Sequence, residues 1–378
     1  GDTTTALEIL EDAYLRSKDH LGEDNWVTLS GNIVRATTYA KKERFRKAIE
    51  LAEDTYSRYV SQFSETDPQT FSTRNSLAQI YLQAGNASQA INHCLALLNS
   101  LADTNSQDLD FILTVLNNLA AAYQQDEQVS DAIEVFEYIC NQPISVHKNG
   151  YHDYYICKCN LAAAYRQDHQ PARAISILEQ ICEESKQTIG SYHSDRFHFR
   201  TLLAKWYLED RDFTNAVKVL KTLHEDSGRT FANDSKNTLE YEHMLAFAYA
   251  EQGDFHSALP FIEHAYNSRL STLGASDTAT LESKYNFAFT LLRLNDWDRA
   301  IPLLVEALND PHMNTDQLTD TQLNLAYAYH MQNDFTAALK TYLLARKTCQ
   351  QDPDAYAEKL NYANQQISSL RAILRQTE

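Results

Sequence analysis

The sequence predicts an all-α fold, an α-solenoid or superhelix of about eight antiparallel helix-turn-helix repeats of 42 residues. A motif of small and aromatic residues recurs at a nearly constant interval, and an internal period of roughly 20 to 50 residues indicates a stack of repeated units. Gly and Pro are also sparse, with 9 and 7 in 378 residues. Few helix breakers suit a chain that is helical almost throughout.

Alanine sets the interval. In each unit one Ala, the anchor, precedes Ile, Val or Leu, and the step between anchors is 42 residues, except for a last step of 38. The anchors are Ala48, Ala90, Ala132, Ala174, Ala216, Ala258, Ala300 and Ala338, and Ala6 lies one period before the first. A second Ala stands twelve residues before each of the eight anchors from Ala48 to Ala338. A Tyr stands nine residues before each anchor, except that Leu291 takes this place before Ala300.

The residue sizes explain the motif. A small residue lets a neighbouring helix approach closely, and a Tyr one turn later fills the space beside it. The aliphatic residues next to the two alanines form stripes at helical spacing. Each unit is therefore predicted to be two helices, A and B, whose apolar faces are covered only when units stack.

The period also predicts the domain boundaries. We expect a solenoid over 1–350, with a truncated first unit at 1–24 and units near 25–66, 67–108, 109–150, 151–192, 193–234, 235–276, 277–316 and 317–350. The first unit has a B helix without an A helix, so we expect the polypeptide to belong to a larger protein. We predict helix N-caps at Asn25, Asp67, Ser194, Ser235 and Asp277.

The C-terminal stretch 351–378 departs from the motif and is predicted to be a capping helix. It carries one apolar stripe of residues at three- and four-residue spacing: Leu360, Ala363, Ile367, Leu370 and Leu374. Repeat arrays need such a cap. The alternative is self-association through a short coiled coil over 353–376.

The repeated residues resemble those of the tetratricopeptide repeat family. Leu119, Ala120, Tyr123, Ala132 and Phe136 occupy that family's offsets, and the resemblance covers residues 6 to about 346. The long period and loops such as LGASDTATL (273–281) are most similar to kinesin light chains and related bacterial and fungal proteins. The resemblance implies that helix A lines a concave face that binds extended or helical peptides.

The candidate groove residues on helix A differ between the two halves of the chain. The first half offers mainly amides: Asn75, Gln79, Asn117, Asn118, Gln124 and Asn160, followed by Arg166 and Lys205. The second half offers mainly aromatic rings: Phe247, Tyr285, Asn286, Phe289, Asn324 and Tyr327. Amides can pair with a peptide backbone, and aromatic rings add contact area at little entropic cost. Alternatively, the Asn residues bond locally between units, and Phe247 and Phe289 only pack.

Charge and composition bear on the partners. The net charge of −18 without a basic run argues against nucleic acid. No transmembrane run is visible, so no membrane partner is expected. Six Cys, largely at core-facing positions, suggest a reducing compartment, the cytoplasm. The loop histidines His147, His152, His193 and His198 match no standard ligand spacing, and we expect no metal and no cofactor.

These observations favour a non-catalytic protein- or peptide-binding scaffold, the interaction or sensor arm of a larger intracellular protein. No catalytic motif is present. The alternative is a peptide-responsive regulatory receptor, in which the array is coupled to a DNA-binding or kinase domain. A basic groove that selects acidic peptides has thin support, from Arg166, Arg200, Lys205 and Lys284.

Overall fold

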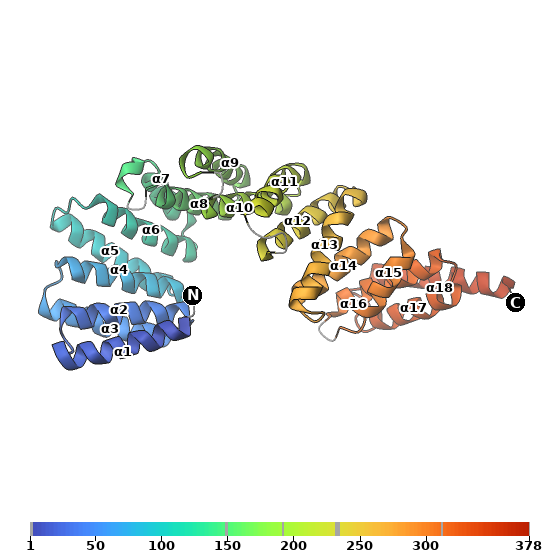
Figure 1. Cartoon of the computed structure of the whole chain (residues 1–378), viewed down its shortest axis with the longest axis horizontal. Helices are drawn as coiled ribbons and strands as arrows, with labels where there is room; N and C mark the ends of the chain where they lie inside the picture. Colours follow the sequence, from blue (N-terminus) through green and yellow to red (C-terminus); the bar gives the residue numbers. More distant parts are fainter. Residues whose placement is uncertain (1–2, 148–149, 191–192, 231–234, 311–312, 378) are drawn as a thin grey trace. The chain divides into compact units, whose positions relative to one another are not determined.

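The computed structural model describes residues 3–147, 150–190, 193–230, 235–310 and 313–377. Within these ranges the chain forms eighteen α-helices and one short 3-10 helix, and no strand (Figure 1). The predicted all-α repeat fold is confirmed. None of the helices in this part of the chain is long and apolar enough to cross a membrane.

The helices follow one another as A and B pairs. The A helices are α2 (Trp26–Lys41), α4 (Pro68–Gln83), α6 (Leu109–Gln125), α8 (Tyr151–Gln167), α10 (Ser194–Glu209), α12 (Lys236–Glu251), α14 (Thr278–Arg293) and α16 (Thr315–Met331). The B helices are α3 (Phe45–Gln62), α5 (Ala87–Asp103), α7 (Val129–Cys140), α9 (Pro171–Thr188), α11 (Phe213–Thr230), α13 (Phe255–Leu273), α15 (Trp297–Ala307) and α17 (Phe335–Cys349). Helix α1 (Thr3–Leu21) precedes the pairs, α18 (Ala357–Thr377) follows them, and η1 (Ile144–Val146) lies between α7 and α8.

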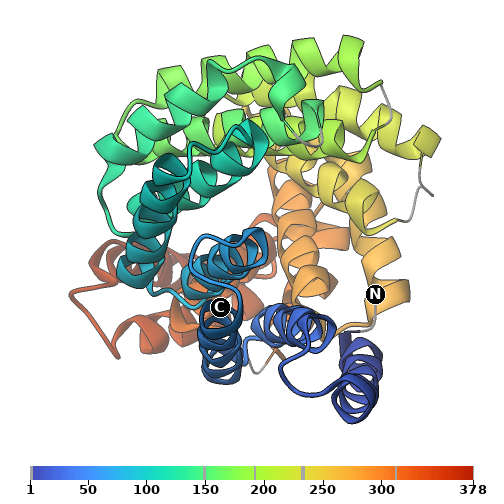
Figure 2. The ribbon, with the colours of Figure 1, turned by 90° about the vertical axis from the view of Figure 1, so that its left-hand side faces the viewer.

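Contacts divide the chain into two compact units, Gly1–Phe199 and Arg200–Glu378. Consecutive helices lie side by side from α1 to α9 in the first unit and from α11 to α18 in the second (Figures 1 and 2). In the first unit α2 contacts α4, α4 contacts α6 and α6 contacts α8, and in the second α12 contacts α14 and α14 contacts α16. Successive B helices make no comparable contact within the described residues. Within each unit the A helices therefore lie on the inner side of the curved stack.

The alanines lie where the helices touch. Each anchor from Ala48 to Ala338, and each Ala twelve residues before it, exposes at most 3% of its surface. A larger side chain at these positions would push neighbouring helices apart, because protein cores are close-packed. The repeated alanines of the sequence thus mark where the helices of the solenoid contact one another.

The repeated Tyr also connects neighbouring pairs. The Tyr39 hydroxyl donates a hydrogen bond of 2.6 Å to Glu11 Oε1, on the helix preceding its own pair. Tyr81 donates in the same way to Glu53, and Tyr165 to Glu137. Burial raises the pKa of Tyr81, so its phenol stays protonated and remains a donor. The Tyr therefore fills space and also fixes one pair on the next.

A second repeated position joins the two helices within a pair. Four residues before the first Ala of each of five successive pairs lies a buried polar side chain that bonds to the B helix. The pairs are Lys158–Glu184 (3.3 Å), Arg200–Asp226 (2.7 Å), Glu242–His264 (2.7 Å), Lys284–Glu306 (3.1 Å) and Gln322–Thr348 (3.0 Å). In the Arg200–Asp226 pair, in which both side chains are largely buried, removal of Asp226 would leave the Arg200 charge without its partner, which is destabilising.

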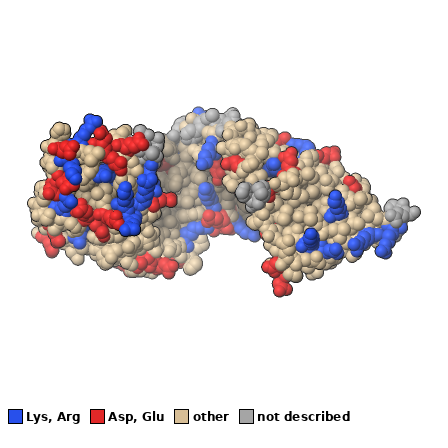
Figure 3. All heavy atoms as spheres, turned by 90° about the horizontal axis from the view of Figure 1, so that it is seen from below, with Lys and Arg blue, Asp and Glu red and all other residues tan. Residues whose placement is uncertain are grey.

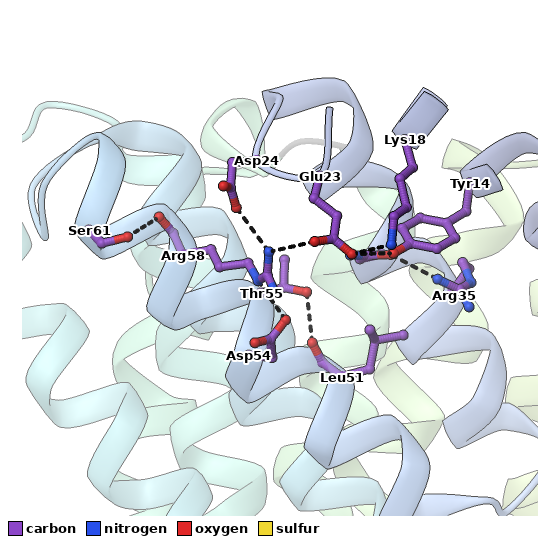
Figure 4. A network of polar contacts seen from close by, with 11 residues as sticks. Tyr14, Lys18, Glu23, Asp24, Arg35, Leu51, Asp54, Thr55, Arg58 and Ser61 are labelled. Atoms are coloured by element: carbon purple, nitrogen blue, oxygen red, sulfur yellow. Dashed lines mark hydrogen bonds and ion pairs between the residues drawn. The ribbon is translucent and has the colours of Figure 1, made fainter. Parts of the chain in front are cut away.

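A polar network holds the first helix against the pair that follows it (Figure 4). Arg58 on α3 contacts Asp24 at 2.9 Å and Asp54 at 2.8 Å. It also lies 3.7 Å from Glu23, which pairs with Lys18 on α1. Arg35 on α2 lies over the Tyr14 ring of α1, at 4.2 Å from its centre. These contacts from α1, α2 and α3 supplement the apolar packing at this end.

The apolar stripe of α18 is covered by the chain itself. Ala363, Ile367 and Leu370 are at most 2% exposed and pack against α17, where they meet the buried Tyr342. A coiled-coil seam would need this stripe to be exposed. We therefore propose that α18 caps the last pair.

Local sequence signals define most helix starts. The side chains of Asn25, Asp67, Ser235 and Asp277 accept a backbone N–H from the first turn of the helix that follows, as predicted for N-caps. Ser194 instead is the first residue of α10. Such caps satisfy N–H groups that have no partner within a helix.

The anchor position should not tolerate a larger side chain. We expect Ala174→Leu to lower the free energy of unfolding by about 1–3 kcal/mol, because Ala174 is fully buried and added methylenes overpack a core. Thermal unfolding followed by circular dichroism measures the change. Ala172→Leu on the same helix is the matched control, since Ala172 is exposed, and equal melting temperatures for the two variants would contradict the assignment of the anchor.

Candidate functional site

The inner face of the second unit brings the predicted aromatic residues together. We call this surface the aromatic groove, and it comprises Phe247, Tyr285, Asn286, Phe289, Asn324 and Tyr327. These residues come from three successive A helices, α12, α14 and α16. Phe247 and Tyr327 are 43% and 38% exposed, and the other four are partly buried.

Three cavities have residues of the aromatic groove in their walls. One of about 210 Å³ is lined by Phe247, Tyr285, Asn286 and Phe289. A second, of about 570 Å³, is lined by Phe289, Asn324 and Tyr327. A third, of about 340 Å³, has Tyr285 in its wall beside Leu281, Ala307 and Met313. Phe289 belongs to the first and second cavities, and Tyr285 to the first and third, so neighbouring cavities share a wall.

Three of the four rings of the groove are supported by a ring from the preceding B helix. The ring centres of Phe247 and Phe213 lie 6.3 Å apart, and those of Phe289 and Phe255 lie 6.2 Å apart. Tyr327 lies 5.7 Å from Trp297. All three pairs meet edge to face, an arrangement worth about 0.5–1.5 kcal/mol beyond area burial. The groove rings therefore both pack against the solenoid and line the cavities.

The supporting rings follow a signal that the sequence analysis missed. Phe213, Phe255 and Trp297 each stand three residues before an anchor Ala, as do Phe45 and Phe335. A search for this second repeated aromatic position would have identified them.

Some polar groups of the groove already have hydrogen-bond partners within the second unit. The Asn286 amide lies 2.8 Å from Nε2 of His243 on α12. Burial lowers the pKa of His243, which favours a neutral ring that accepts this bond. Burial raises the pKa of Tyr285, so its phenol remains protonated and able to donate.

The amides of the first unit bond to one another. Asn118 Nδ2 donates to Asn75 Oδ1 at 2.9 Å, and Asn160 Nδ2 donates to Asn117 Oδ1 at 3.3 Å. These bonds join successive A helices, which is the local bonding weighed as an alternative. Each amide keeps further donor or acceptor capacity. A backbone clamp by these residues remains a prediction.

The remaining candidates of the first half lie on separate helices. Gln79 on α4 and Lys205 on α10 are exposed, whereas Gln124 on α6 and Arg166 on α8 are partly buried. The Gln124 backbone carbonyl accepts a bond of 3.2 Å from Gln167. The cavities described above contain none of these four residues.

The basic-groove interpretation is wrong for two of its four residues. Arg200 and Lys284 are 6% and 5% exposed, and both pair with an acidic residue on the B helix of their own pair. Both positive charges therefore form ion pairs within the fold. The residue four positions before the first Ala of a pair faces helix B. The residue one position after that Ala faces the groove.

The loop histidines have different surroundings. His152 Nδ1 lies 2.6 Å from Asp195, and the exposed His193 lies 3.5 Å from the same carboxylate. His198 is exposed, whereas His147 is buried at 7% exposure. The described residues include no group of three His, Cys, Asp or Glu placed to hold a metal ion.

Stacked helix pairs with an inner groove define a protein-interaction scaffold of the helical-repeat class. Tetratricopeptide repeat models match residues 33–106, 237–309 and 285–355, together just over half of the chain. The chain belongs to the tetratricopeptide repeat family. The long, kinesin-light-chain-like repeat expected from the sequence agrees with A helices that begin about 42 residues apart. Comparison with curated protein sequences found no match.

Two solved structures share this fold at low sequence identity, and a third is similar over part of its length. The apo form of RapI is 9% identical with a TM-score of 0.59, over 92% of this chain and 98% of that chain. The STAND protein PH0952 from Pyrococcus horikoshii, with a tetratricopeptide repeat sensor, is 13% identical with a TM-score of 0.57, over 94% and 55% of the two chains. A putative kinesin light chain from Podosopora anserina is 19% identical with a TM-score of 0.35, over 65% and 96%.

The buried His243 should make stability depend on pH. Its folded-state pKa lies below the ordinary value of 6.5, so the unfolded chain binds the proton more readily and stability falls as pH drops below about 6.5. We expect His243→Gln to lose less stability than the parent between pH 7 and about 5, as measured by urea unfolding at each pH. Some dependence remains, since burial also lowers the pKa of His93 and His147.

The exposed His256 on the next helix provides the control. His256→Gln should leave the parent pH dependence unchanged. A His243→Gln profile that is parallel to that of the parent would show that this residue does not titrate on unfolding.

Proposed function

We propose that the aromatic groove binds an extended or helical peptide that carries apolar side chains. The observation that carries the proposal is the set of three adjacent cavities, which share Tyr285, Phe289 and Asp320 in their walls. Adjacent cavities on successive helices suit a peptide that places apolar side chains in them. Buried aromatic anchors of this kind supply most of the energy in many interfaces.

The groove also offers polar groups for a peptide backbone. Asn286 and Asn324 lie among the aromatic residues, on α14 and α16. An amide side chain can donate to a backbone carbonyl and accept from a backbone N–H. These contacts would orient a peptide without selecting its sequence, whereas the cavities would select apolar side chains.

Charge around the groove favours a neutral or basic peptide. Glu251, Glu282 and Asp320 line the three cavities, and Arg293 lines one of them. Figure 3 shows that Lys and Arg are interspersed with Asp and Glu over the first unit, whereas much of the visible face of the second unit carries neither. Like-charge contacts disfavour the wrong partner. An acidic peptide would therefore bind less well.

We further propose that the protein acts without catalysis and in a reducing compartment, the cytoplasm. The six cysteines are free, and four of them are buried in the helical core. Burial raises the pKa of the Cys94 and Cys159 thiols to about 12, so these side chains act as small apolar residues.

Phe289→Ala tests the groove, because Phe289 is the wall common to two cavities. Peptides selected on the full chain from a random 12-residue library are labelled, and their affinity is measured by fluorescence anisotropy. We expect at least tenfold weaker binding to Phe289→Ala, since truncating a central aromatic anchor typically costs about 2 kcal/mol or more.

Leu344→Ala is the matched control, because Leu344 is exposed on the B helix α17. It should leave the affinity unchanged. Selected peptides that bind the parent and Phe289→Ala equally well would contradict the proposed site.

A further inference from the structure

Two cysteine thiols from successive helix pairs lie close together in the first unit. Cys140 is the last residue of α7, the B helix of one pair, and Cys157 lies within α8, the A helix of the next. The two helices lie side by side, and neither thiol is in a disulfide. The two Sγ atoms are 3.4 Å apart, so an approach of about 1.4 Å would bring them to the disulfide bond length of about 2.05 Å.

The two thiols differ in exposure. Cys140 is partly exposed at the end of its helix, whereas only 3% of the surface of Cys157 is exposed. The hydrogen bond with Cys140 and burial raise the pKa of Cys157, so this sulfur stays protonated. An oxidant in solution therefore reaches Cys140 first. An accessible cysteine with a second cysteine beside it is the arrangement of redox-sensing sites.

We propose that Cys140 and Cys157 form a redox modification site, at which a hydroperoxide creates a disulfide bond between two successive helix pairs. Cys140 is the thiol that reacts with the oxidant, and Cys157 is the thiol that completes the bond. In a reducing compartment both groups rest as thiols, and the bond forms only when the oxidant is present. The site lies in the first unit and does not depend on peptide binding in the aromatic groove.

The reaction has two steps. The Cys140 thiolate attacks the terminal oxygen of the hydroperoxide, the O–O bond breaks, and the released alkoxide takes a proton and leaves as an alcohol, or as water when the oxidant is hydrogen peroxide. Cys140 is then a sulfenic acid. The Cys157 sulfur attacks the Cys140 sulfur, the S–S bond forms, and the S–O bond breaks. The hydroxide leaves as water with the proton of the Cys157 thiol. The two sulfurs lose two electrons in total, and the peroxide gains them.

The disulfide would restrain the junction between the two pairs. Units of a solenoid contact only their neighbours, so each junction is held by local packing. A covalent bond from the end of α7 to α8 adds a restraint that packing alone does not supply. Local opening of the two helices should therefore become rarer in the oxidised form, and their backbone amides should exchange hydrogen more slowly.

Peptide mapping of the full chain after treatment with hydrogen peroxide tests the proposal. Remaining thiols are alkylated, and the chain is digested under denaturing conditions with trypsin and a glutamyl endopeptidase. Cleavage after Glu137 and after Lys158 separates Cys140 from the preceding chain and Cys157 from Cys159. We expect mass spectrometry to find one product that joins the Cys140 and Cys157 fragments, and dithiothreitol to abolish it.

Three results of the mapping would overturn the proposal. They are a cross-link from Cys140 to Cys159 instead, oxidation of Cys140 to a sulfinic acid with no cross-link, and no oxidation of either thiol. Hydrogen exchange followed by mass spectrometry then compares the oxidised and reduced forms. Exchange should be slower in α7 and α8 of the oxidised form and unchanged in α13 of the second unit, whereas equal exchange in α7 and α8 would contradict the restraint.

Substitutions establish the order of the two thiols. Cys157→Ser should leave a sulfenic acid at Cys140 that dimedone traps, whereas Cys140→Ser should give no dimedone adduct at Cys157. An adduct at Cys157 in that variant would contradict the assigned order. Cys94→Ser, at a buried site on α5, is the matched control and should form the cross-link as the parent does. Circular dichroism confirms that each variant is folded. Phe289→Ala should also form it, so failure of the aromatic groove and failure of the thiol pair give different results.

Discussion

Close approach of helices, permitted by two alanines in every pair, is the constraint on which the rest of this structure depends. With a methyl group at the contact line, each A helix can touch its own B helix and the helices of the neighbouring pair. The repeated Tyr then reaches across to a Glu on the preceding B helix in several of these steps. Contacts in a solenoid connect only neighbouring units, so the same local solution is repeated along the chain.

Each A helix has three faces that make different contacts. The alanines face neighbouring helices, the position four residues before the first Ala faces the B helix of the same pair, and the position after it faces the inner surface. Lys284 and Phe289 illustrate the division, because the first is buried in an ion pair and the second lines two cavities. Residue type alone does not assign a side chain to a groove, since a Lys can serve as a structural partner.

The inner surfaces of the two units offer different chemistry on the same scaffold. The second unit presents rings supported by the preceding B helix, with cavities that suit apolar side chains. The first unit presents amides that bond to one another. The chemistry of the inner face therefore differs between the units, whereas the spacing of the two alanines in a pair is the same in both.

The period, the helix pairs, most N-caps and the aromatic character of the second half were predictable from the amino-acid sequence alone. These features are local: a cap such as Asp67 and a stripe such as that of α18 depend on neighbours within a few turns. It also placed the six residues of the aromatic groove on the helices that form it.

Contacts between side chains about 42 residues apart depend instead on tertiary packing. The bond between Asn75 and Asn118, the sharing of Phe289 by two cavities and the burial of His147 all depend on how successive pairs pack. Packing angles and side-chain orientations across several helices set such contacts, and no period along one chain specifies them. The fold was therefore predictable from spacing, whereas the bonding of the amides and the burial of His147 were not.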